Sequence, residues 1–226
     1  MHIPALARVL PFATFMLFIA LPETLGFLSQ SLVPAPETMQ HFYPVQIGIP
    51  LLLMLVFRKQ YIELSLSELG RFAHTALSIA TGIVVYILWI HMDWAVFSST
   101  PSPGFRPHLF DNPSIRIIMT AIRVFGAAIV VPLFEELFWR SFLTRYLAGR
   151  DFMAVPQGTF TVFTFTATAL LFGLEHTYLF AGIMAGIAYN LLYRQTRSTT
   201  QCVLSHAVTN GLLCLHVLTT EEWHYW

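Results

Sequence analysis

Apolar residues run through the chain in long stretches that short polar stretches separate. A helix that crosses a membrane needs about 20 mostly apolar residues, and seven stretches reach or approach that length. These stretches are residues 9–27, 43–57, 72–91, 113–147, 160–174, 178–193 and 203–218. The pattern therefore predicts an all-α, polytopic integral membrane helical bundle with about seven to eight transmembrane helices.

Two of these predicted spans need comment. Residues 9–27 are hydrophobic enough for a signal peptide, but no small-residue cleavage site follows and further spans do, so we interpret them as a first span. Residues 113–147 are longer than a bilayer requires, so this helix is expected to tilt or project. Within it, Pro132 lacks a backbone donor and is expected to kink the helix.

Composition supports a membrane protein. Hydrophobic residues make up 56% of the chain and charged residues 11%, against about 25% charged in soluble domains. Twelve basic residues balance twelve acidic ones, so no basic excess favours nucleic acid as a partner. Cys202 and Cys214 would lie about 18 Å apart on one helix, too far for a disulfide, and are expected to pack in the core. No linker or repeat divides residues 1–226, which predicts a single membrane domain.

Basic residues predict the orientation, because cytoplasmic ends of spans carry more Lys and Arg. With the N-terminus in the cytoplasm, nine fall on or near that side: Arg8, Arg58, Lys59, Arg71, Arg140, Arg145, Arg150, Arg194 and Arg197. Arg106 and Arg116 fall outside. Arg123 lies within the fourth span, where a backbone carbonyl or an acid such as Asp111 is its simplest partner. We therefore expect a cytoplasmic N-terminus.

Two adjacent carboxylates lie inside the fourth predicted span. Ionisable residues in a span are costly and suggest function. Glu136 and Arg140 are four residues apart, in the favourable order for an ion pair on one helix face. Glu135 lies about 100° further round the helix. One carboxylate can therefore be neutralised while the other stays free for chemistry; alternatively, the group is a charge cluster at the cytoplasmic end of a long helix.

Two further polar groups occupy later spans. Phe172 and His176 end the fifth span, and His206 and Asn210 lie in the seventh, each pair four residues apart on one helix face. Alone, a histidine at a helix end is commonly interfacial, and a His/Asn pair can simply join helices. Together with the fourth span, these groups supply two carboxylates, an arginine, two imidazoles and an amide from three helices.

The sixth predicted span has the spacing of a close helix contact. Gly182 and Gly186 form a GxxxG pattern, which lets a neighbouring helix approach closely. We interpret it as internal packing that helps to bring the fifth and seventh spans together. Tyr189 and Asn190 on the same helix are weaker candidates for lining a site.

The ordered motifs EExxxR, FxxxH and HxxxN resemble those of the CPBP intramembrane proteases, which include the type II CAAX prenyl endopeptidases and bacterial Abi proteins. The resemblance covers roughly residues 113–216, which would be the motif-bearing core. The first hundred residues carry no matching motif. Glu175 is a departure, because a small or apolar residue commonly precedes that histidine in the family.

The resemblance implies an intramembrane endopeptidase that cleaves membrane-associated peptides or C-terminal tails. Glu135 would be the general base, and His176 would position the same water. His206 and Asn210 would donate hydrogen bonds to the oxyanion. The partners would be a membrane-anchored peptide or protein substrate and the lipid bilayer. By analogy with bacterial relatives, we expect a bacterial inner membrane and, as the preferred niche, a sorting-signal protease.

The same resemblance gives Glu136 and Arg140 a supporting role, with the arginine holding the carboxylate and fixing the helix around the site. A metal site remains open, since His176, His206 and a Glu could bind catalytic zinc. No HExxH motif places two histidines on one turn. We therefore favour a glutamate-type mechanism without a cofactor, with a zinc metalloprotease as the alternative.

Two other functional classes stay open at this point. A transporter or proton-relay protein could use Glu135 and Glu136, although no inverted repeat is visible. A non-catalytic protein of the bacteriocin-immunity kind could keep the motif residues as scaffold.

A catalytic site would require His176 and Glu135 to lie at the same depth in the membrane. They would lie at different depths if every span were full length. The fifth span, about 22 Å long, must therefore be short or tilted.

Overall fold

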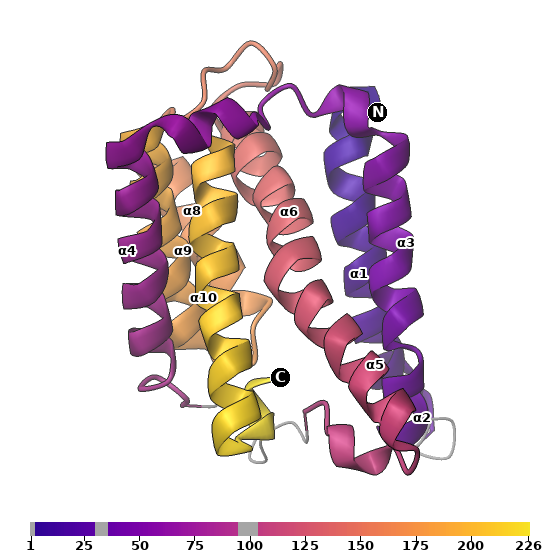
Figure 1. The fold of residues 1–226 in the computed structure, drawn as a ribbon. Helices are drawn as coiled ribbons and strands as arrows, with labels where there is room; N and C mark the ends of the chain where they lie inside the picture. The colour runs from indigo at the N-terminus through magenta and orange to yellow at the C-terminus, as the bar shows by residue number, and fades with distance from the viewer. Residues whose placement is uncertain (1–2, 30–35, 95–103) are drawn as a thin grey trace.

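The structure, a computed structural model, describes residues 3–29, 36–94 and 104–226 and is a bundle of helices with no strand in these ranges (Figure 1). The long helices are α1 (Ile3–Leu28), α3 (Tyr43–Val56), α4 (Phe72–Trp89), a composite helix over Pro113–Ala148, α8 (Val162–Leu174), α9 (Leu179–Thr196) and α10 (Thr199–Thr220). Short helices are α2 (Pro36–His41), η2 (Arg58–Gln60), η3 (Leu66–Gly70), η4 (Pro107–Leu109) and η7 (Trp223–Tyr225). The predicted all-α fold is confirmed.

Within the described residues, five helices are long and apolar enough to cross a membrane. They cover Ile3–Leu21, Thr38–Val56, Phe72–Trp89, Pro113–Ala148 and Thr199–Thr220. Helix α8 is apolar but has only 13 residues, and α9 is buried along much of its length inside the bundle. A helix surrounded by protein needs less apolar surface than one facing lipid, which explains why α9 falls outside the five.

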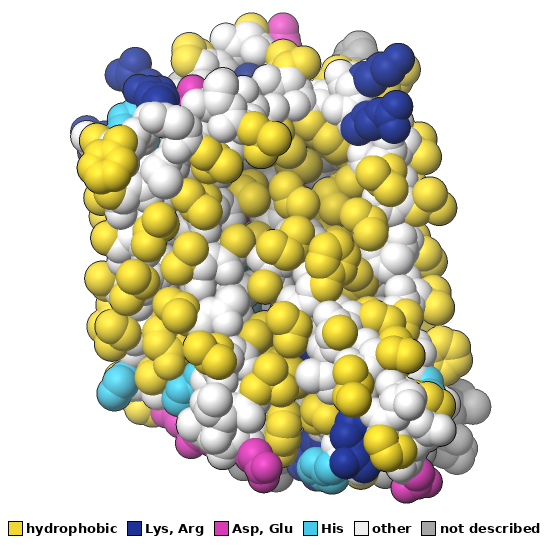
Figure 2. All heavy atoms as spheres, viewed as in Figure 1, with side chains coloured by type: hydrophobic (Ala, Val, Ile, Leu, Met, Phe, Trp, Pro, Cys, Tyr) yellow, Lys and Arg dark blue, Asp and Glu magenta, His cyan; other side chains and the backbone are white. Residues whose placement is uncertain are grey.

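Hydrophobic side chains cover the middle of the visible face of the bundle, and charged side chains gather at its two ends (Figure 2). Exposed apolar residues lie on α3, α4, α5 and α8, including Leu52, Phe72, Ile117 and Val162. In a soluble protein, so much contiguous apolar surface would be a liability. Here it is the surface that lipid covers, and the polytopic membrane assignment is confirmed.

The composite helix alternates between α-helical and π-helical turns. It consists of α5 (Pro113–Phe125), η5 (Gly126–Val130), α6 (Val131–Glu136), η6 (Leu137–Leu143) and α7 (Thr144–Ala148), and it crosses the bundle diagonally (Figure 1). A π-helical turn ends at Val130, two residues before Pro132, in the turn where a regular helix would meet the proline ring. A second follows Glu136, and the Thr144 hydroxyl donates to the Trp139 carbonyl five residues earlier, at 2.8 Å. The glutamate pair therefore sits between two widened turns.

Small residues let α8 and α9 pack with their backbones in contact. A Cβ added to Gly182 would lie 2.8 Å from Gly173 Cα, and one added to Gly186 would lie 3.0 Å from Ala169 Cα. The expected internal role of the GxxxG pattern is therefore confirmed. Asn190 strengthens the same contact by donating to Thr168 Oγ1 at 2.9 Å.

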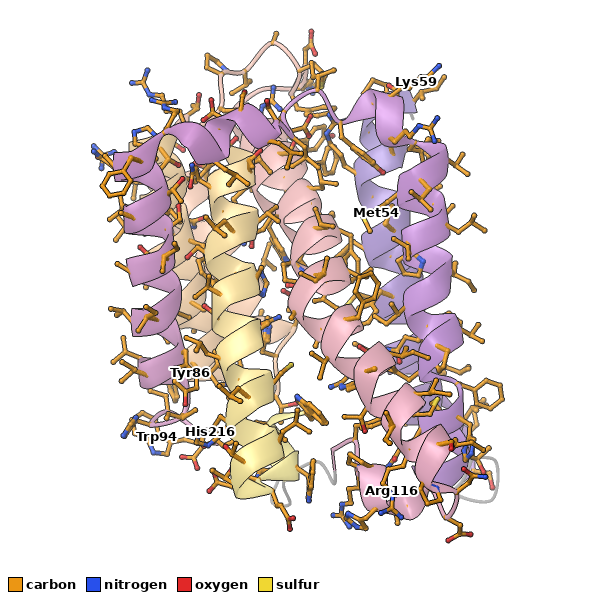
Figure 3. The ribbon with its side chains drawn as sticks, viewed as in Figure 1. Met54, Lys59, Tyr86, Trp94, Arg116 and His216 are labelled. Atoms are coloured by element: carbon orange, nitrogen blue, oxygen red, sulfur yellow. The ribbon has the colours of Figure 1, made fainter. Side chains whose placement is uncertain are left out.

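The two ends of the bundle differ in charge. Arg71, Arg194 and Arg197 line one pocket at the end that carries the N-terminus, and Lys59 lies at this end, whereas Arg116 lies at the other (Figure 3). This distribution agrees with the expected orientation, which remains a prediction.

Arg8, one of the basic residues placed on or near the cytoplasmic side, is buried inside the bundle. Its side chain is fully buried and pairs with Glu63 through Nη2 and Oε2 at 2.6 Å. Arg8 Nε also donates to Glu63 Oε1 at 2.7 Å, and the Ser141 hydroxyl donates to the same carboxylate. The network therefore ties α1 to the segment after η2 and to the composite helix.

Candidate active site

Glu136, Arg140 and His206 form a buried chain of charged contacts. Arg140 Nη1 lies 3.0 Å from Glu136 Oε1, and His206 Nδ1 lies 2.9 Å from the same oxygen. The Glu136 and Arg140 side chains are 0% and 1% exposed. The guanidinium also lies over the rings of Phe172 and Tyr189, with Cζ 4.7 and 5.3 Å from their centroids. Glu136 and Arg140 thus form the ion pair that their spacing predicts. From the composite helix, Glu136 also contacts His206, which lies on α10.

Glu135 points to a different space from Glu136. It lines a cavity of about 210 Å³ together with His176, His206 and Asn210. Glu135 Oε2 lies 3.9 Å from His206 Nε2 and has no hydrogen-bond partner among the described residues. One carboxylate is therefore neutralised inside the protein, while its neighbour faces a space large enough for several water molecules.

His176 reaches this cavity because α8 ends early. At 13 residues, α8 is about 20 Å long, which meets the condition that the fifth span be short. His176 Nδ1 lies 2.7 Å from the Phe172 carbonyl, so Nδ1 is the donor and Nε2 is left as an acceptor. The Trp89 ring packs against the imidazole, with centroids 5.3 Å apart. The histidine is thus fixed in both tautomer and position.

Asn210 lines the same cavity but is already engaged. Its Nδ2 donates to the Ala127 carbonyl at 2.9 Å, in the π-helical segment η5. One amide hydrogen remains for another acceptor. The structure therefore brings Glu135, His176, His206 and Asn210 around one space, with Glu136 and Arg140 buried beside it.

The sequence predicted three residues of the site only weakly or not at all: Trp139, Glu175 and Tyr189. Trp139 Nε1 donates to Glu175 Oε1 at 2.9 Å, and Glu175 lines the cavity. Tyr189 stacks on His206 with centroids 5.1 Å apart, and its hydroxyl donates to Thr209. The position of Glu175 beside His176 was a usable signal, whereas Trp139 has the sequence context of an ordinary apolar residue. Asn190, considered with Tyr189, joins helices instead.

A cation could be held at the cavity, although by a different set from the one expected. Ligand atoms of Glu135, Glu175 and His176 all lie within 4.8 Å of one another. Oε2 of Glu135 and of Glu175 are both buried without a partner among the described residues, so these donors fit a divalent metal with an open coordination position. His206, which the sequence suggested as a ligand, is not part of this set.

The fold and the cavity define a polytopic membrane protein with a buried carboxylate–histidine site. Residues 117–212 match the family model described as type II CAAX prenyl endopeptidase Rce1-like. This match agrees with the resemblance of the motifs, and all six motif residues lie within the matched range. No curated protein and no solved structure gives a match.

Proposed function

We propose that this protein is an intramembrane endopeptidase that hydrolyses membrane-anchored peptides or C-terminal tails with water activated by Glu135. The main observation behind the proposal is that two adjacent carboxylates have different environments. Arg140 neutralises Glu136, whereas Glu135 faces the cavity beside two histidines. The Rce1-like match supports protease activity at the level of the family.

In this mechanism, a water in the cavity donates one hydrogen bond to Glu135 and one to Nε2 of His176. Glu135 takes a proton as the water oxygen attacks the scissile carbonyl carbon, and the carbonyl oxygen becomes an oxyanion. Donors from His206 and Asn210 stabilise that oxyanion. Glu135 then returns the proton to the leaving amine as the C–N bond breaks.

His206 can donate a hydrogen bond from Nε2 into the cavity only as the imidazolium, because its Nδ1–H is already bonded to Glu136. Its Nδ1 donates to Glu136, so a second donor at Nε2 requires the imidazolium. Two carboxylates and one guanidinium then surround it, and Glu135, Glu136, Arg140 and His206 sum to zero charge. A buried cluster that is neutral as a whole avoids the largest desolvation cost.

We propose that this reaction proceeds without a metal. Should a divalent ion be present, Glu135, Glu175 and His176 would hold it, and it would supply Lewis acidity to the carbonyl or water. Enzyme stripped with a strong chelator and verified metal-free is expected to keep its cleavage rate. Activity that tracks zinc content and returns only with zinc would contradict the proposal.

The decisive experiment compares Glu135→Gln with the wild type in liposomes that contain lipid-anchored peptides with varied C-terminal tails. Mass spectrometry of the released fragments measures cleavage. We expect Glu135→Gln to be nearly inactive, because an amide cannot take the proton. A matched change in a half-buried carboxylate outside the cavity lining, Glu68→Gln, should leave the rate unchanged. Full activity in Glu135→Gln would overturn the mechanism. A proton flux without cleavage would favour a relay protein instead.

We also propose that the N-terminus is cytoplasmic in a bacterial inner membrane, with a substrate of the sorting-signal kind. The clustering of Arg71, Arg194 and Arg197 at the N-terminal end of the bundle supports this orientation. Reporter fusions at Lys59 are expected to report a cytoplasmic position. A fusion there that reports the opposite side would contradict the orientation but not the reaction.

A further inference from the structure

A basic pocket lies apart from the candidate active site, at the end of the bundle that carries the N-terminus. It has a volume of about 810 Å³. Arg71 directly precedes α4, Arg194 lies in the last turn of α9, and Arg197 follows that helix. All three line the pocket, and no acidic residue is among the described residues that line it. Segments distant in the sequence therefore bring three positive charges to one hollow.

The positive charge of the basic pocket is only partly compensated within the protein. Arg71 Nη1 lies 3.2 Å from Glu68 Oε2 in a solvent-exposed pair, and exposed pairs are weak. The Arg194 guanidinium lies over the Phe160 ring, with Cζ 4.4 Å from the centroid. Neither Arg194 nor Arg197 forms an ion pair with a described residue. Two guanidinium groups therefore keep donors available for an anion.

Arg123, the arginine within the fourth predicted span, contrasts with these three. Its guanidinium is enclosed by aromatic rings, with Cζ 4.6 Å from the centroid of Tyr43, 5.9 Å from that of Phe105 and 5.8 Å from that of Trp226. None of the described ion pairs joins it to Asp111, so that expected pairing was wrong. Cation–π contacts thus surround this arginine, whereas the arginines of the basic pocket are exposed.

Arg197 has a backbone conformation that suits glycine better than arginine. Its φ is 53° and its ψ is 37°, in the left-handed region, where glycine is common directly after a helix. Gly158, in the loop before α8, packs against it so closely that a Cβ there would lie 2.7 Å from Arg197 Cγ. An arginine at a strained position beside a pocket suggests a function for its side chain.

His74 adds a donor to the wall of the basic pocket. Its Nε2 lies 3.5 Å from Arg71 Nη2, and because a guanidinium only donates, Nε2 is the acceptor and Nδ1 carries the hydrogen. Nδ1 is buried without a hydrogen-bond partner among the described residues. No side chain caps the start of α4 between Arg71 and His74, so the positive end of this helix dipole also borders the pocket.

Apolar residues that face lipid adjoin the basic pocket. Phe72 follows Arg71 and is exposed, and Phe160, which lines the pocket, is followed by the exposed Val162 and Phe163. Basic side chains at this end of the bundle lie directly above the apolar face (Figure 2). A phosphate in the pocket would therefore lie at the height of lipid headgroups, with apolar surface below it for acyl chains.

We propose that the basic pocket binds the phosphate group of an anionic membrane lipid, whose acyl chains lie along the exposed apolar residues of α4 and α8. Guanidinium groups form paired hydrogen bonds with phosphate oxygens, and basic pockets beside membrane spans suit anionic headgroups. A bound lipid would connect the start of α4, the loop before α8 and the end of α9. The inference goes beyond the proposed protease function and does not depend on it.

The test measures lipid binding to the delipidated, detergent-solubilised protein by native mass spectrometry. The probes are phosphatidylglycerol and phosphatidylcholine with the same acyl chains, so that only the headgroup differs. For the wild type, we expect phosphatidylglycerol to bind about 10–100-fold more tightly, the range of a charge-assisted hydrogen bond. In Arg194→Gln/Arg197→Gln this ratio should fall toward one.

Two further variants separate the pocket from net charge. Arg58→Gln/Lys59→Gln removes the same number of charges outside the pocket lining, with Lys59 at the same end of the bundle (Figure 3), and should keep the wild-type ratio. Arg194→Lys/Arg197→Lys should give an intermediate ratio, because lysine keeps the charge but lacks the planar pair of donors. All four side chains are exposed, so each variant should keep the wild-type Tm, which is measured without lipid.

A competition experiment distinguishes a lipid phosphate from a soluble one. Inorganic phosphate at the concentration of the lipid should not displace phosphatidylglycerol, because it makes no contact with the apolar surface. Displacement under these conditions would overturn the assignment to a lipid. Equal binding of the two lipids by the wild type, or a preference that Arg194→Gln/Arg197→Gln retains in full, would overturn the site itself.

Discussion

Arg140→Met is expected to destabilise the fold strongly. Arg140 is the cation that compensates Glu136, and both side chains are almost fully buried. Methionine keeps much of the apolar contact with Phe172 and Tyr189 but removes the charge and the bonds to Glu136 Oε1 and the Gly186 carbonyl. Breaking a buried ion pair from one side costs about 3–5 kcal/mol. For a chain of this length, that corresponds to a fall in Tm of about 6–20 °C.

A buried cysteine provides the assay. Cys202 is 0% exposed and lies outside the cavity lining, whereas Cys214 lines the cavity. In a Cys214→Ala background, the remaining thiol should therefore not react with a fluorogenic maleimide until the bundle unfolds. Heating the detergent-solubilised protein with this reagent therefore yields a melting curve without added labels. The wild type and each variant are compared in one detergent at one protein concentration.

Arg71→Met is the matched control. Arg71 also pairs with a glutamate, Glu68, at 3.2 Å, but its side chain is 52% exposed. Exposed pairs contribute about 0.2–1 kcal/mol, so this Tm should fall by no more than about 4 °C. Adding Glu136→Gln to Arg140→Met should recover part of the loss, because the uncompensated carboxylate is removed. Equal melting of Arg140→Met and Arg71→Met would refute the claim that this pair supports the site.

Three further predictions concern packing and catalysis. Gly182→Ala places a Cβ 2.8 Å from Gly173 Cα and should cost about 1–3 kcal/mol by overpacking, seen as a lower Tm, whereas Gly211→Ala, with nothing within 4 Å of its new Cβ, should not lower it. Asn210→Ala should reduce kcat by about 10²–10³ if the amide stabilises the oxyanion; an unchanged kcat would limit Asn210 to its bond with Ala127. The cleavage rate should fall as pH falls, because only ionised Glu135 accepts a proton; a rate that rises in acid would argue against a carboxylate base.

The fold could be predicted well because the bilayer imposes a simple rule on sequence. Long apolar stretches must be helical where no water satisfies the backbone, and each predicted span is a helix in the structure. The π-helical turns around α6 could not be predicted, since Pro132 indicates a disturbance but not its form. The burial of Arg8 depends on Glu63, 55 residues away, a contact that local pattern does not reveal.

For the candidate site, too, contacts within one helix could be predicted from the sequence, whereas contacts between helices could not. A spacing of four residues is enough to place Glu136 beside Arg140, because both lie on one helix. Whether Glu175 and Tyr189 join them depends on how closely α8 and α9 approach the composite helix. Backbone contact at glycines holds α8 against α9, but the glycine pattern does not reveal which side chains of these two helices face the composite helix. Arg123 illustrates the limit, since its aromatic surroundings come from three separate segments.

The size of the cavity has a kinetic consequence. Its volume of about 210 Å³ is below the 300–1,000 Å³ of pockets that enclose drug-sized ligands, so it holds water but not a peptide several residues long. Under the proposed function, each turnover then includes an opening step, and the measured affinity for the peptide is lowered because only the open fraction of molecules can bind it. Helix α1 contributes Phe15, Met16 and Ile19 to the cavity wall, while its buried ion pair lies near its start, at Arg8. Lipids that press the helices together should then slow the enzyme without touching a catalytic group.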